Sequence, residues 1–237
     1  MEKLNSKLLK DFYEHEADWK SFWGSPREKL LVENILLELR KVKVKRVLEV
    51  GMGDGFLLYS LKRVKPNVES YGVDISRKRV VKASKALKDY GGYFVIADAT
   101  ALPFKAKAFN YLVYSEVLEH IPDNDSALSE AYRVLQSEGS ILITVPFKQN
   151  LVQIMCPYCH RLFNPDGHIH SYDENKLVQI IHKAGFKVVK LRGFGSWLSS
   201  NRFTRTLPFA IRYVLDKISY CSLKSAKYYI LVGQKSR

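Results

Sequence analysis

A glycine-rich turn with acidic neighbours follows the first apolar run of the sequence. The glycines stand at alternate positions, and the acids lie just before and within the turn: Gly51, Gly53 and Gly55, with Glu49 and Asp54. Glycine lets the backbone approach a ligand closely, with no side chain in between. A dinucleotide site would space its glycines G-x-G-x-x-G, so that a helix N-terminus meets a pyrophosphate. The acids would repel a pyrophosphate, so this turn favours a ligand that carries an ammonium or sulfonium group.

Two further acids end the next two β-rich runs. Asp74 follows residues 70–73, and Asp98 follows residues 93–97. Ligands of open α/β sheets lie outside the carboxyl ends of the strands, where both acids would stand. A carboxylate at Asp74 would accept hydrogen bonds from both hydroxyls of a ribose, and Asp98 is placed to accept one from an adenine amino group. Each acid alone is equally typical of a solvated loop or a helix cap, but three in succession predict an adenosine-containing ligand.

The elements that must position these acids alternate along the chain. Strands are expected at residues 46–50, 70–73, 93–97, 110–114, 140–145, 186–191 and 227–232, and helices at 26–40, 56–64, 76–90, 125–136 and 173–183. Ser25, followed by a proline and then Glu28, predicts a capping box at the start of the first helix. This alternation predicts an α/β fold: an open, mainly parallel sheet with helices on both faces.

The chain resembles the class I (Rossmann-like) methyltransferases, and among them the methyltransferase type 11 group. The resemblance covers residues 30–145 and 170–191 and is carried by the segments VLEVGMGDG, YGVDIS, DATALPF, FNYLVYSEVLEHIPD, EAYRVLQSEGSILITVP and HSYDENKLVQIIHKAGF. It implies a seven-stranded sheet whose last strand is antiparallel, with S-adenosylmethionine as cofactor. By position, it implies methionine contacts at Glu49, Gly51, Gly53 and Gly55, ribose and adenine contacts at Asp74, Ile75, Asp98 and Ala99, and a floor beside the sulfonium at Ser115 and Glu116.

The segment after the fourth strand bears on the methyl acceptor. Amino-directed DNA methyltransferases carry an Asn/Asp-Pro-Pro-aromatic tetrad there, whereas residues 115–118 are Ser-Glu-Val-Leu, and the Pro-Cys pair of cytosine-C5 enzymes is absent. A small-molecule acceptor with an oxygen or nitrogen nucleophile is therefore expected; RNA- or protein-directed transfer and a non-catalytic cofactor-binding subunit are the alternatives. His120 is the histidine nearest the expected methyl donor. It is a candidate general base, and a structural histidine at the strand-to-helix turn is the competing interpretation.

A cysteine and histidine cluster lies in the irregular stretch after the fifth strand. Its spacing is C-x2-C-x8-H-x-H, formed by Cys156, Cys159, His168 and His170. Two thiolates and two imidazoles are typical of a tetrahedral, structural Zn²⁺ site. Free thiols and a redox pair are the alternatives. In a further variant His168 faces the substrate and His160 takes its place as ligand.

Positive charge is concentrated near the C-terminal end of the sequence. Residues 176–237 contain thirteen Lys and Arg and one acid, Asp216, so they carry +12 of the net +14. This asymmetry indicates an anionic partner, such as an anionic acceptor, a nucleic acid or an acidic membrane surface, and a lysine-rich surface that serves solubility is the alternative. Apolar residues at helical spacing within it predict a helix that covers the substrate pocket, with a peripheral membrane helix as the alternative: Leu207, Ile211, Val214, Leu215 and Ile218.

Length and composition favour one large domain. Residues 1–40 are expected to form an N-terminal helical cap and residues 41–237 the methyltransferase domain, in which 147–172 is the metal-binding insertion and 192–225 the substrate cap. The aromatic residues Trp19, Phe22 and Trp23 are expected either to close the pocket or to pack in the core. Three cysteines and the mixed charges of the first residues, without an apolar stretch, favour a cytoplasmic protein.

Overall fold

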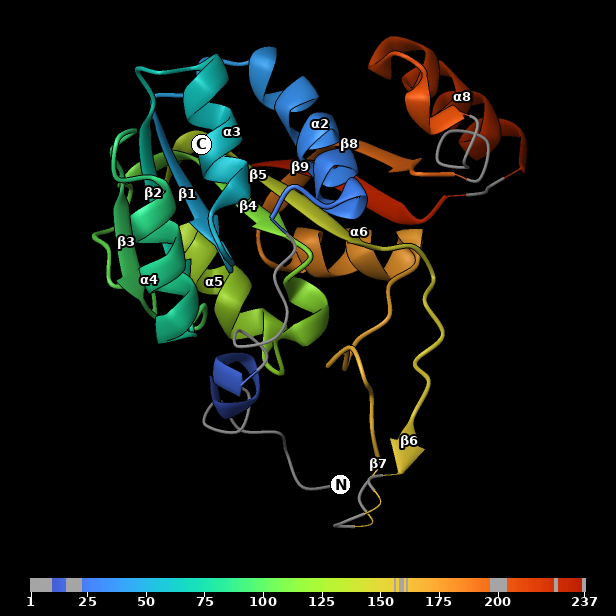
Figure 1. Ribbon diagram of the computed structural model, residues 1–237, viewed down its shortest axis with the longest axis horizontal. Helices are drawn as coiled ribbons and strands as arrows, with labels where there is room; N and C mark the ends of the chain where they lie inside the picture. Colours follow the sequence, from blue (N-terminus) through green and yellow to red (C-terminus); the bar gives the residue numbers. More distant parts are fainter. Residues whose placement is uncertain are drawn as a thin grey trace.

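A seven-stranded sheet runs through the middle of the protein in the spatial order β3-β2-β1-β4-β5-β9-β8 (Figure 1). The structure, a computed structural model, describes residues 10–15, 23–155, 157, 160, 162–196, 204–223 and 226–235. The strands of the sheet are β1 (Arg46–Val50), β2 (Glu69–Asp74), β3 (Tyr93–Ile96), β4 (Phe109–Ser115), β5 (Leu135–Pro146), β8 (Phe186–Phe194) and β9 (Tyr228–Lys235). β1 to β5 pair in parallel, and β9 pairs antiparallel with both β5 and β8. The predicted mainly parallel sheet with an antiparallel last strand is confirmed.

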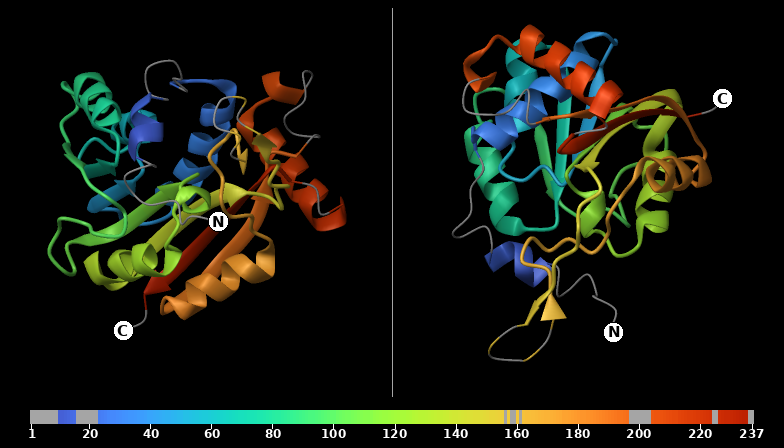
Figure 2. Two further views of the ribbon diagram at one scale, coloured as in Figure 1. Left: turned by 90° about the horizontal axis from the view of Figure 1, so that it is seen from below. Right: turned by 90° about the vertical axis from the view of Figure 1, so that its right-hand side faces the viewer.

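Helices cover both faces of this sheet (Figure 2). One face carries α2 (Pro26–Arg40), α3 (Phe56–Val64) and α4 (Arg77–Ala86), and the other carries α5 (Asn124–Val134) and α6 (Glu174–Lys183). Ile35 and Leu58 belong to the apolar core of the first face, whereas Leu128 and Leu177 belong to the core of the second. Because both faces are buried, the inner strands contain runs of consecutive buried apolar side chains, such as Tyr111 to Tyr114 of β4.

Side-chain hydrogen bonds cap the N-termini of α2 and α4, two helices that border the candidate site. Ser25 Oγ accepts a hydrogen bond from the Glu28 amide at 3.2 Å, and the Glu28 carboxylate accepts one from the Gly24 amide at 2.8 Å. The return bond therefore reaches one residue further back than in a standard capping box. Ser76 Oγ caps α4 by accepting from the Arg79 amide at 3.3 Å. These bonds satisfy amides that the first turn of a helix leaves without partners.

Several element boundaries differ from those expected. β8 and β9 each end three residues later, at Phe194 and Lys235, and two further differences have a clear cause. α4 ends at Ala86 rather than at residue 90, because the chain turns there with the Tyr90 and Gly91 amides both bonded to the Leu87 carbonyl. β5 begins at Leu135, inside the expected helix 125–136, because Leu135 pairs with Phe109 of β4. These last two differences arise from hydrogen bonds and strand pairing that local helix propensity does not predict.

The expected insertion forms a two-stranded hairpin that projects from the body of the protein (Figures 1 and 2). Its strands are β6 (Ile154–Met155) and β7 (Leu162–Phe163), which pair antiparallel. All four strand residues expose their side chains. Cys156 and Cys159, predicted zinc ligands, lie outside the described residues.

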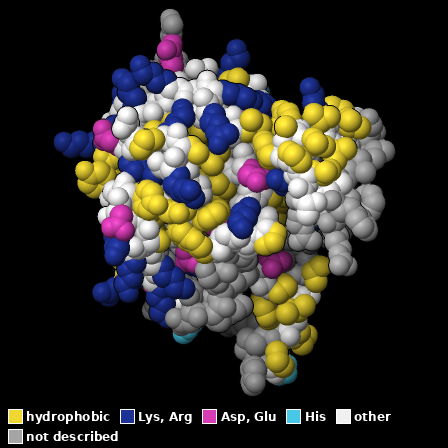
Figure 3. Space-filling view, turned by 45° about the horizontal axis from the view of Figure 1, so that its top comes forward, with side chains coloured by type: hydrophobic (Ala, Val, Ile, Leu, Met, Phe, Trp, Pro, Cys, Tyr) yellow, Lys and Arg dark blue, Asp and Glu magenta, His cyan; other side chains and the backbone are white. Residues whose placement is uncertain are grey.

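The basic C-terminal region contains η2 (Thr204–Thr206) and α8 (Phe209–Leu223). α8 packs against β8, and Arg212 bonds to Glu33 of α2 at 2.7 Å. Three of its apolar side chains point to the solvent, where Figure 3 shows a hydrophobic patch: Ile211, Val214 and Ile218. None of the helices in the described part of the chain is both long enough and apolar enough to cross a bilayer.

Candidate functional site

A cleft of about 1100 Å³ opens at the carboxyl ends of β1, β2 and β4, where the predicted acids lie. Nine of the ten residues predicted to bind the cofactor line it: Glu49, Gly51, Gly53, Asp74, Ile75, Asp98, Ala99, Ser115 and Glu116. The tenth, Gly55, starts α3 with φ +86°, and a Cβ there would lie 2.7 Å from Leu87 and 3.0 Å from Ala83. Gly55 thus allows α3 to pack closely on α4, which is a different task from lining the cleft.

Glu49 gives the cleft a buried carboxylate with an unused acceptor. Its side chain comes from β1 and is 3% exposed, and Oε2 has no hydrogen-bond partner among the described residues. Burial raises the pKa of Glu49 well above its ordinary range, and the nearby charges of Glu28 and Asp74 add to this effect. A buried carboxylate oxygen without a partner is costly, so this position suits a ligand that brings a positive charge.

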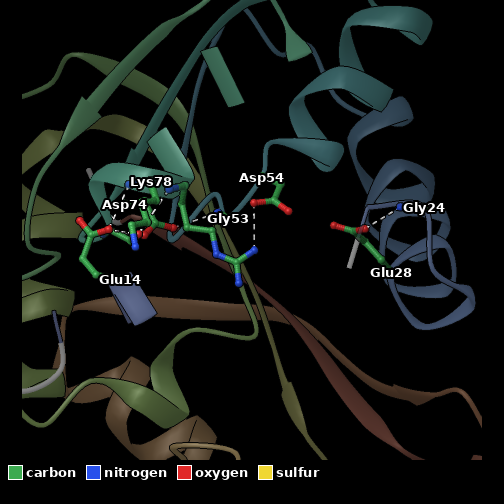
Figure 4. Close-up of polar contacts among 9 residues, drawn as sticks. Glu14, Gly24, Glu28, Gly53, Asp54, Asp74 and Lys78 are labelled. Atoms are coloured by element: carbon green, nitrogen blue, oxygen red, sulfur yellow. Dashed lines mark hydrogen bonds and ion pairs between the residues drawn. The ribbon is translucent and has the colours of Figure 1, made fainter. Parts of the chain in front are cut away.

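Asp54, the second acid of the glycine turn, has a cationic partner within the protein. Its Oδ1 lies 2.9 Å from the Arg79 guanidinium of α4, and both side chains are about 7% exposed. The interpretation that both acids of the turn offer charge to a ligand is therefore wrong for Asp54. Glu49 remains the acid of this turn whose oxygen lacks a partner. The Asp54–Arg79 pair instead joins the turn to α4, and Figure 4 shows the contact of Asp54 as a dashed line.

Asp74 holds the glycine turn and also faces the cleft. Its Oδ2 accepts from the Gly53 amide and its Oδ1 from the Ser76 amide, both at 2.9 Å (Figure 4). Burial raises the pKa of Asp74 to about 6, against these two amide bonds, which lower it. Each carboxylate oxygen has two lone pairs, so both oxygens retain an acceptor site for a ribose hydroxyl.

Asp98 forms a tight turn after β3. Its Oδ1 accepts from the amide and the hydroxyl of Thr100, at 2.9 and 2.8 Å. Both of its hydrogen bonds within the described part of the chain therefore use one oxygen. This leaves Oδ2 available to accept a hydrogen bond from a ligand in the cleft.

The floor of the cleft is made by Ser115 and Glu116, at the end of β4. Glu116 adopts φ +57°, in the left-handed region, and its amide bonds to the carbonyl of Thr144 at 3.0 Å. Its Oε2 lies 3.1 Å from the Arg27 guanidinium of α2. Burial raises the pKa of Glu116, and Arg27 opposes that effect. A side-chain-bearing residue held in this strained conformation is typical of a binding or catalytic site.

Histidines form the far end of the cleft, next to the short helix η1 (Leu118–His120). The rings of His120 and His168 are 4.6 Å apart between centroids, and Glu119 lies beside them. Tyr13, from the helical residues 10–15, packs edge-on against His120 with centroids 5.6 Å apart. The predicted base candidate His120 thus lines the cleft together with His168 and His170.

The histidines of the predicted zinc set make other contacts. His168 Nδ1 bonds to Gln149 Oε1, and His170 Nε2 lies 2.9 Å from the carbonyl oxygen of Ile121. Burial lowers the pKa of His170. The structure thus brings His168 to His120 and Glu119. Zinc binding by Cys156 and Cys159 stays a prediction.

Several residues of the site were not singled out from the sequence, among them Arg27, Arg79 and Tyr13, which line the cleft, and Glu119, which lies beside His120. Arg27 and Arg79 are ordinary basic residues of amphipathic helices, and nothing in their local pattern distinguishes them. For Glu119 a signal exists, since it directly precedes the histidine that had been chosen as a candidate base. Trp23, expected near the pocket or in the core, packs on Phe56 and Tyr59 of α3, whereas Trp19 and Phe22 lie outside the described residues.

Two acids at helix N-termini give a first test of how burial and hydrogen bonds shift pKa values. They are Glu28, in the first turn of α2, and Glu14, which bonds to the first turn of α4. Burial raises the pKa of Glu28 to about 7, and the Gly24 amide opposes this. Its protonated form is thus favoured by folding, so its stabilising contribution is present below pH 4.5 and is lost as the pH rises through about 7. We expect Glu28→Gln, which keeps the acceptor for Gly24, to raise the melting temperature at pH 8 and to leave it unchanged at pH 4.5, measured by differential scanning fluorimetry.

Glu14 is the matched control, because its shift has the opposite sign. Burial alone would raise the pKa of Glu14, but the amides of Arg77 and Lys78 bond to its carboxylate and lower it overall. Its contribution is present above pH 4.5 and is lost as the pH falls, so Glu14→Gln should destabilise the protein at pH 8 and have less effect in acid. Equal effects of both variants at both pH values would contradict this assignment.

Comparison with known families and proteins adds to this geometry. The sequence profile of a family described as "Methyltransferase domain" matches residues 23–191. A demethylmenaquinone methyltransferase of Thermotoga maritima is 28% identical over 180 residues, which are 68% of this chain and 76% of that protein. The 2-methyl-6-phytyl-1,4-hydroquinone methyltransferase 2 of Oryza sativa is 32% identical over 191 residues, 80% of this chain but only 51% of the rice protein.

A solved structure shares the fold over nearly its whole length. It is the complex between the Haloferax volcanii Trm112 methyltransferase activator and a putative methyltransferase, matched with a TM-score of 0.67 and 15% sequence identity. The match covers 97% of this chain and 98% of the matched chain.

Proposed function

Since the chain belongs to the methyltransferase-domain family and is an S-adenosylmethionine-dependent methyltransferase, we propose that it methylates an oxygen or nitrogen of a small molecule bound in the cleft. The cofactor supplies, when bound, a methyl group on a positively charged sulfur. The observation that carries the proposal is Glu49: a buried carboxylate oxygen without a partner, at the carboxyl end of β1 and inside the cleft.

The lining of the cleft divides into a cofactor half and an acceptor half. Glu49 would hold the ammonium of the cofactor, Asp74 its ribose hydroxyls and Asp98 its adenine amino group. Gly51 and Gly53 would let the backbone approach the methionine part, and a Cβ at Gly53 would meet nothing within 4 Å, so that side of the turn is open to a ligand. Ser115 and Glu116 would separate this half from the acceptor.

The acceptor half is lined by imidazoles and lysines. His120, His168 and His170 line it, as do Lys176 and Lys183 of α6. Lys183 is paired with Asp125, which also lines this end, as do Asp123 and Asp166, so the lining itself is of mixed charge. Support for an anionic acceptor therefore comes from the basic charge of residues 176–237. His120 Nδ1 bonds to the Gly167 carbonyl at 3.2 Å, which orients the ring. Alignment of the acceptor beside the floor would supply most of the rate, since a reaction between two bound partners is accelerated by proximity.

A quinone-type acceptor is a second candidate. It is favoured by the two relatives named as methyltransferases of demethylmenaquinone and of a hydroquinone. A hydroquinone offers both ring carbons and hydroxyl oxygens, so the position of the methyl group in the product separates the two candidates.

For residues 147–172 we keep the zinc proposal in the variant in which His160 replaces His168 as a ligand. Cys156 and Cys159 would bind the ion with His170 and His160, and His168 would serve the cleft. The ring contact of His168 with His120 supports this assignment. Thiolates and imidazoles are the usual ligands of a closed structural zinc site.

Calorimetric titration tests the proposed function. We expect S-adenosylmethionine and S-adenosylhomocysteine to bind with one site per chain and NAD not to bind. Methyl-labelled donor, offered with panels of small hydroxy, amino and hydroquinone acceptors, should label one class, and mass spectrometry should locate the methyl group. Binding of NAD without binding of S-adenosylmethionine would contradict the proposal, and cofactor binding without turnover on any acceptor would favour a non-catalytic subunit.

A further inference from the structure

A side-chain cluster at the acceptor end of the cleft has the composition of a metal site. Glu119, His120 and His168 each present one ligand atom, and the three atoms lie within 4.8 Å of one another. Metal–ligand bonds to nitrogen and oxygen are about 2.1 Å long, so ligands on opposite sides of one ion are about 4.2 Å apart. Small side-chain rotations would close this difference. Two of the three residues line the cleft directly: His120 and His168.

Glu119 is the observation that points to a cation. Its side chain is fully buried, at 0% exposure, and neither carboxylate oxygen has a hydrogen-bond partner in the described ranges. Arg27 contributes positive charge to this region, but its guanidinium bonds to Glu116. A buried carboxylate with both oxygens unsatisfied is among the costliest groups that a protein can enclose. An ion bound by Glu119 would satisfy both oxygens.

The backbone holds Glu119 in this place. Its own carbonyl accepts hydrogen bonds from the amides of Ile169 and His170, at 2.9 and 3.1 Å. These bonds fasten η1 to the segment that carries His168. The cluster is therefore assembled by two stretches of chain, about fifty residues apart in sequence, that are tied together beside the ligands.

Both imidazoles are oriented as metal ligands usually are. His120 Nδ1 faces the Gly167 carbonyl oxygen, and His168 Nδ1 faces Gln149 Oε1. These oxygens accept hydrogen bonds, so each Nδ1 carries the proton and each Nε2 carries the lone pair. A ligating histidine typically donates its other ring N–H to a carbonyl or carboxylate in this manner.

We propose that Glu119, His120 and His168 bind a divalent transition-metal ion whose remaining positions hold a hydroxyl oxygen of the methyl acceptor. One carboxylate and two imidazoles suit Mn²⁺, Fe²⁺, Co²⁺ or Zn²⁺. The substrate class is then a molecule with a hydroxyl next to a second oxygen, such as a vicinal diol or a catechol, which chelates the ion. This inference rests on the proposed methyl transfer and narrows it to oxygen.

The step is balanced without a further reactant. The bound ion favours loss of the hydroxyl proton to solvent water, and the resulting oxygen supplies the electron pair of the new O–CH3 bond. The S–CH3 bond breaks, its electron pair stays on sulfur, and the sulfonium becomes a neutral thioether. Nothing is oxidised or reduced.

Binding of Mn²⁺ to the chelator-treated full chain tests the site, with free Mn²⁺ followed by electron paramagnetic resonance. Mn²⁺ prefers nitrogen and oxygen ligands to thiolates, so it reports on this cluster and not on a cysteine site. We expect one tightly bound ion per chain, at least tenfold weaker binding in Glu119→Gln and in His168→Asn, and unchanged binding in the C156S/C159S control. Nitrogen hyperfine modulation from imidazole should accompany the bound ion.

S-adenosylhomocysteine binding by calorimetry shows that each variant is folded. Two variants are used because Glu119 lies in a buried turn, whereas His168 is carried by the inserted segment. Mn²⁺ binding that is absent in the wild type, unchanged in both variants, or lost in the cysteine control would overturn the metal site. Cofactor binding without Mn²⁺ binding would refute the metal site alone, whereas Mn²⁺ binding without cofactor binding would refute the proposed function alone.

Discussion

Replacing Glu49 with glutamine is expected to weaken S-adenosylmethionine binding by roughly 10- to 100-fold while raising the melting temperature of the cofactor-free protein. A hydrogen bond to a charged group contributes about 1.5–3 kcal/mol, and each 1.4 kcal/mol is about tenfold in affinity. The variant keeps the shape of the side chain but removes the negative charge that would meet the ammonium of the cofactor. The gain in stability follows because burial raises the pKa of Glu49, which means that the folded protein disfavours its ionised form.

The opposite signs of the two effects make this prediction specific. Calorimetry measures the affinity, and scanning fluorimetry at pH 8 measures the stability of the same sample. Asp89→Asn is the control, since it removes the same charge from an exposed side chain that does not line the cleft and should change neither quantity. Unchanged affinity in Glu49→Gln would remove Glu49 from the cofactor site.

Replacing Arg79 with methionine is expected to cost about 3–5 kcal/mol of unfolding free energy, because removing one partner of a buried ion pair leaves the other charge uncompensated. Here that charge is Asp54, whose side chain is about 7% exposed and lies 2.9 Å from Arg79. The loss is large against the 5–15 kcal/mol or so that holds a typical domain folded. Urea unfolding followed by circular dichroism measures it.

The double variant D54L/R79M separates the pair from the packing around it. A buried ion pair replaced by apolar side chains of similar volume is often neutral in stability, so the double variant should recover to within about 1–2 kcal/mol of the wild type. If the double variant is as unstable as Arg79→Met alone, the cost comes from lost packing of the arginine stem and not from the unpaired acid.

The parts of the fold that local pattern determines were predicted closely. α3 begins after the glycine turn and ends at Val64, as expected, because glycine precedes it and a proline follows at Pro66. The strands that carry the acids end within a residue of their expected places. The start of β5 was not predictable, because residues 136–138 are polar and the strand is determined by the pairing of Leu135 with Phe109.

The residues of the candidate site also divide into those that local sequence pattern predicts and those that it does not. The acids at strand ends could be found because strand ends are visible in the sequence, and Asp74 and Asp98 both face the cleft. The partner of Asp54 could not be found from the sequence, since Arg79 lies 25 positions away, on α4. The difference between Glu49 and Asp54 therefore depends on tertiary structure: one has an oxygen without a partner and the other has a guanidinium.

The place of β9 in the sheet has a consequence for synthesis on the ribosome. β8 is made before β9, but it reaches the sheet only through β9, which lies between it and β5. The outer edge of β5 therefore stays unpaired until residues 228–235 have been made, and an open edge of this kind is a template for association with other chains. Strands β1 to β4, with all the acids at their ends, are complete long before that moment. The residues that these strands bring to the cleft are thus made before the strand that closes the sheet, and a ligand that binds only the folded chain would stabilise the closed sheet.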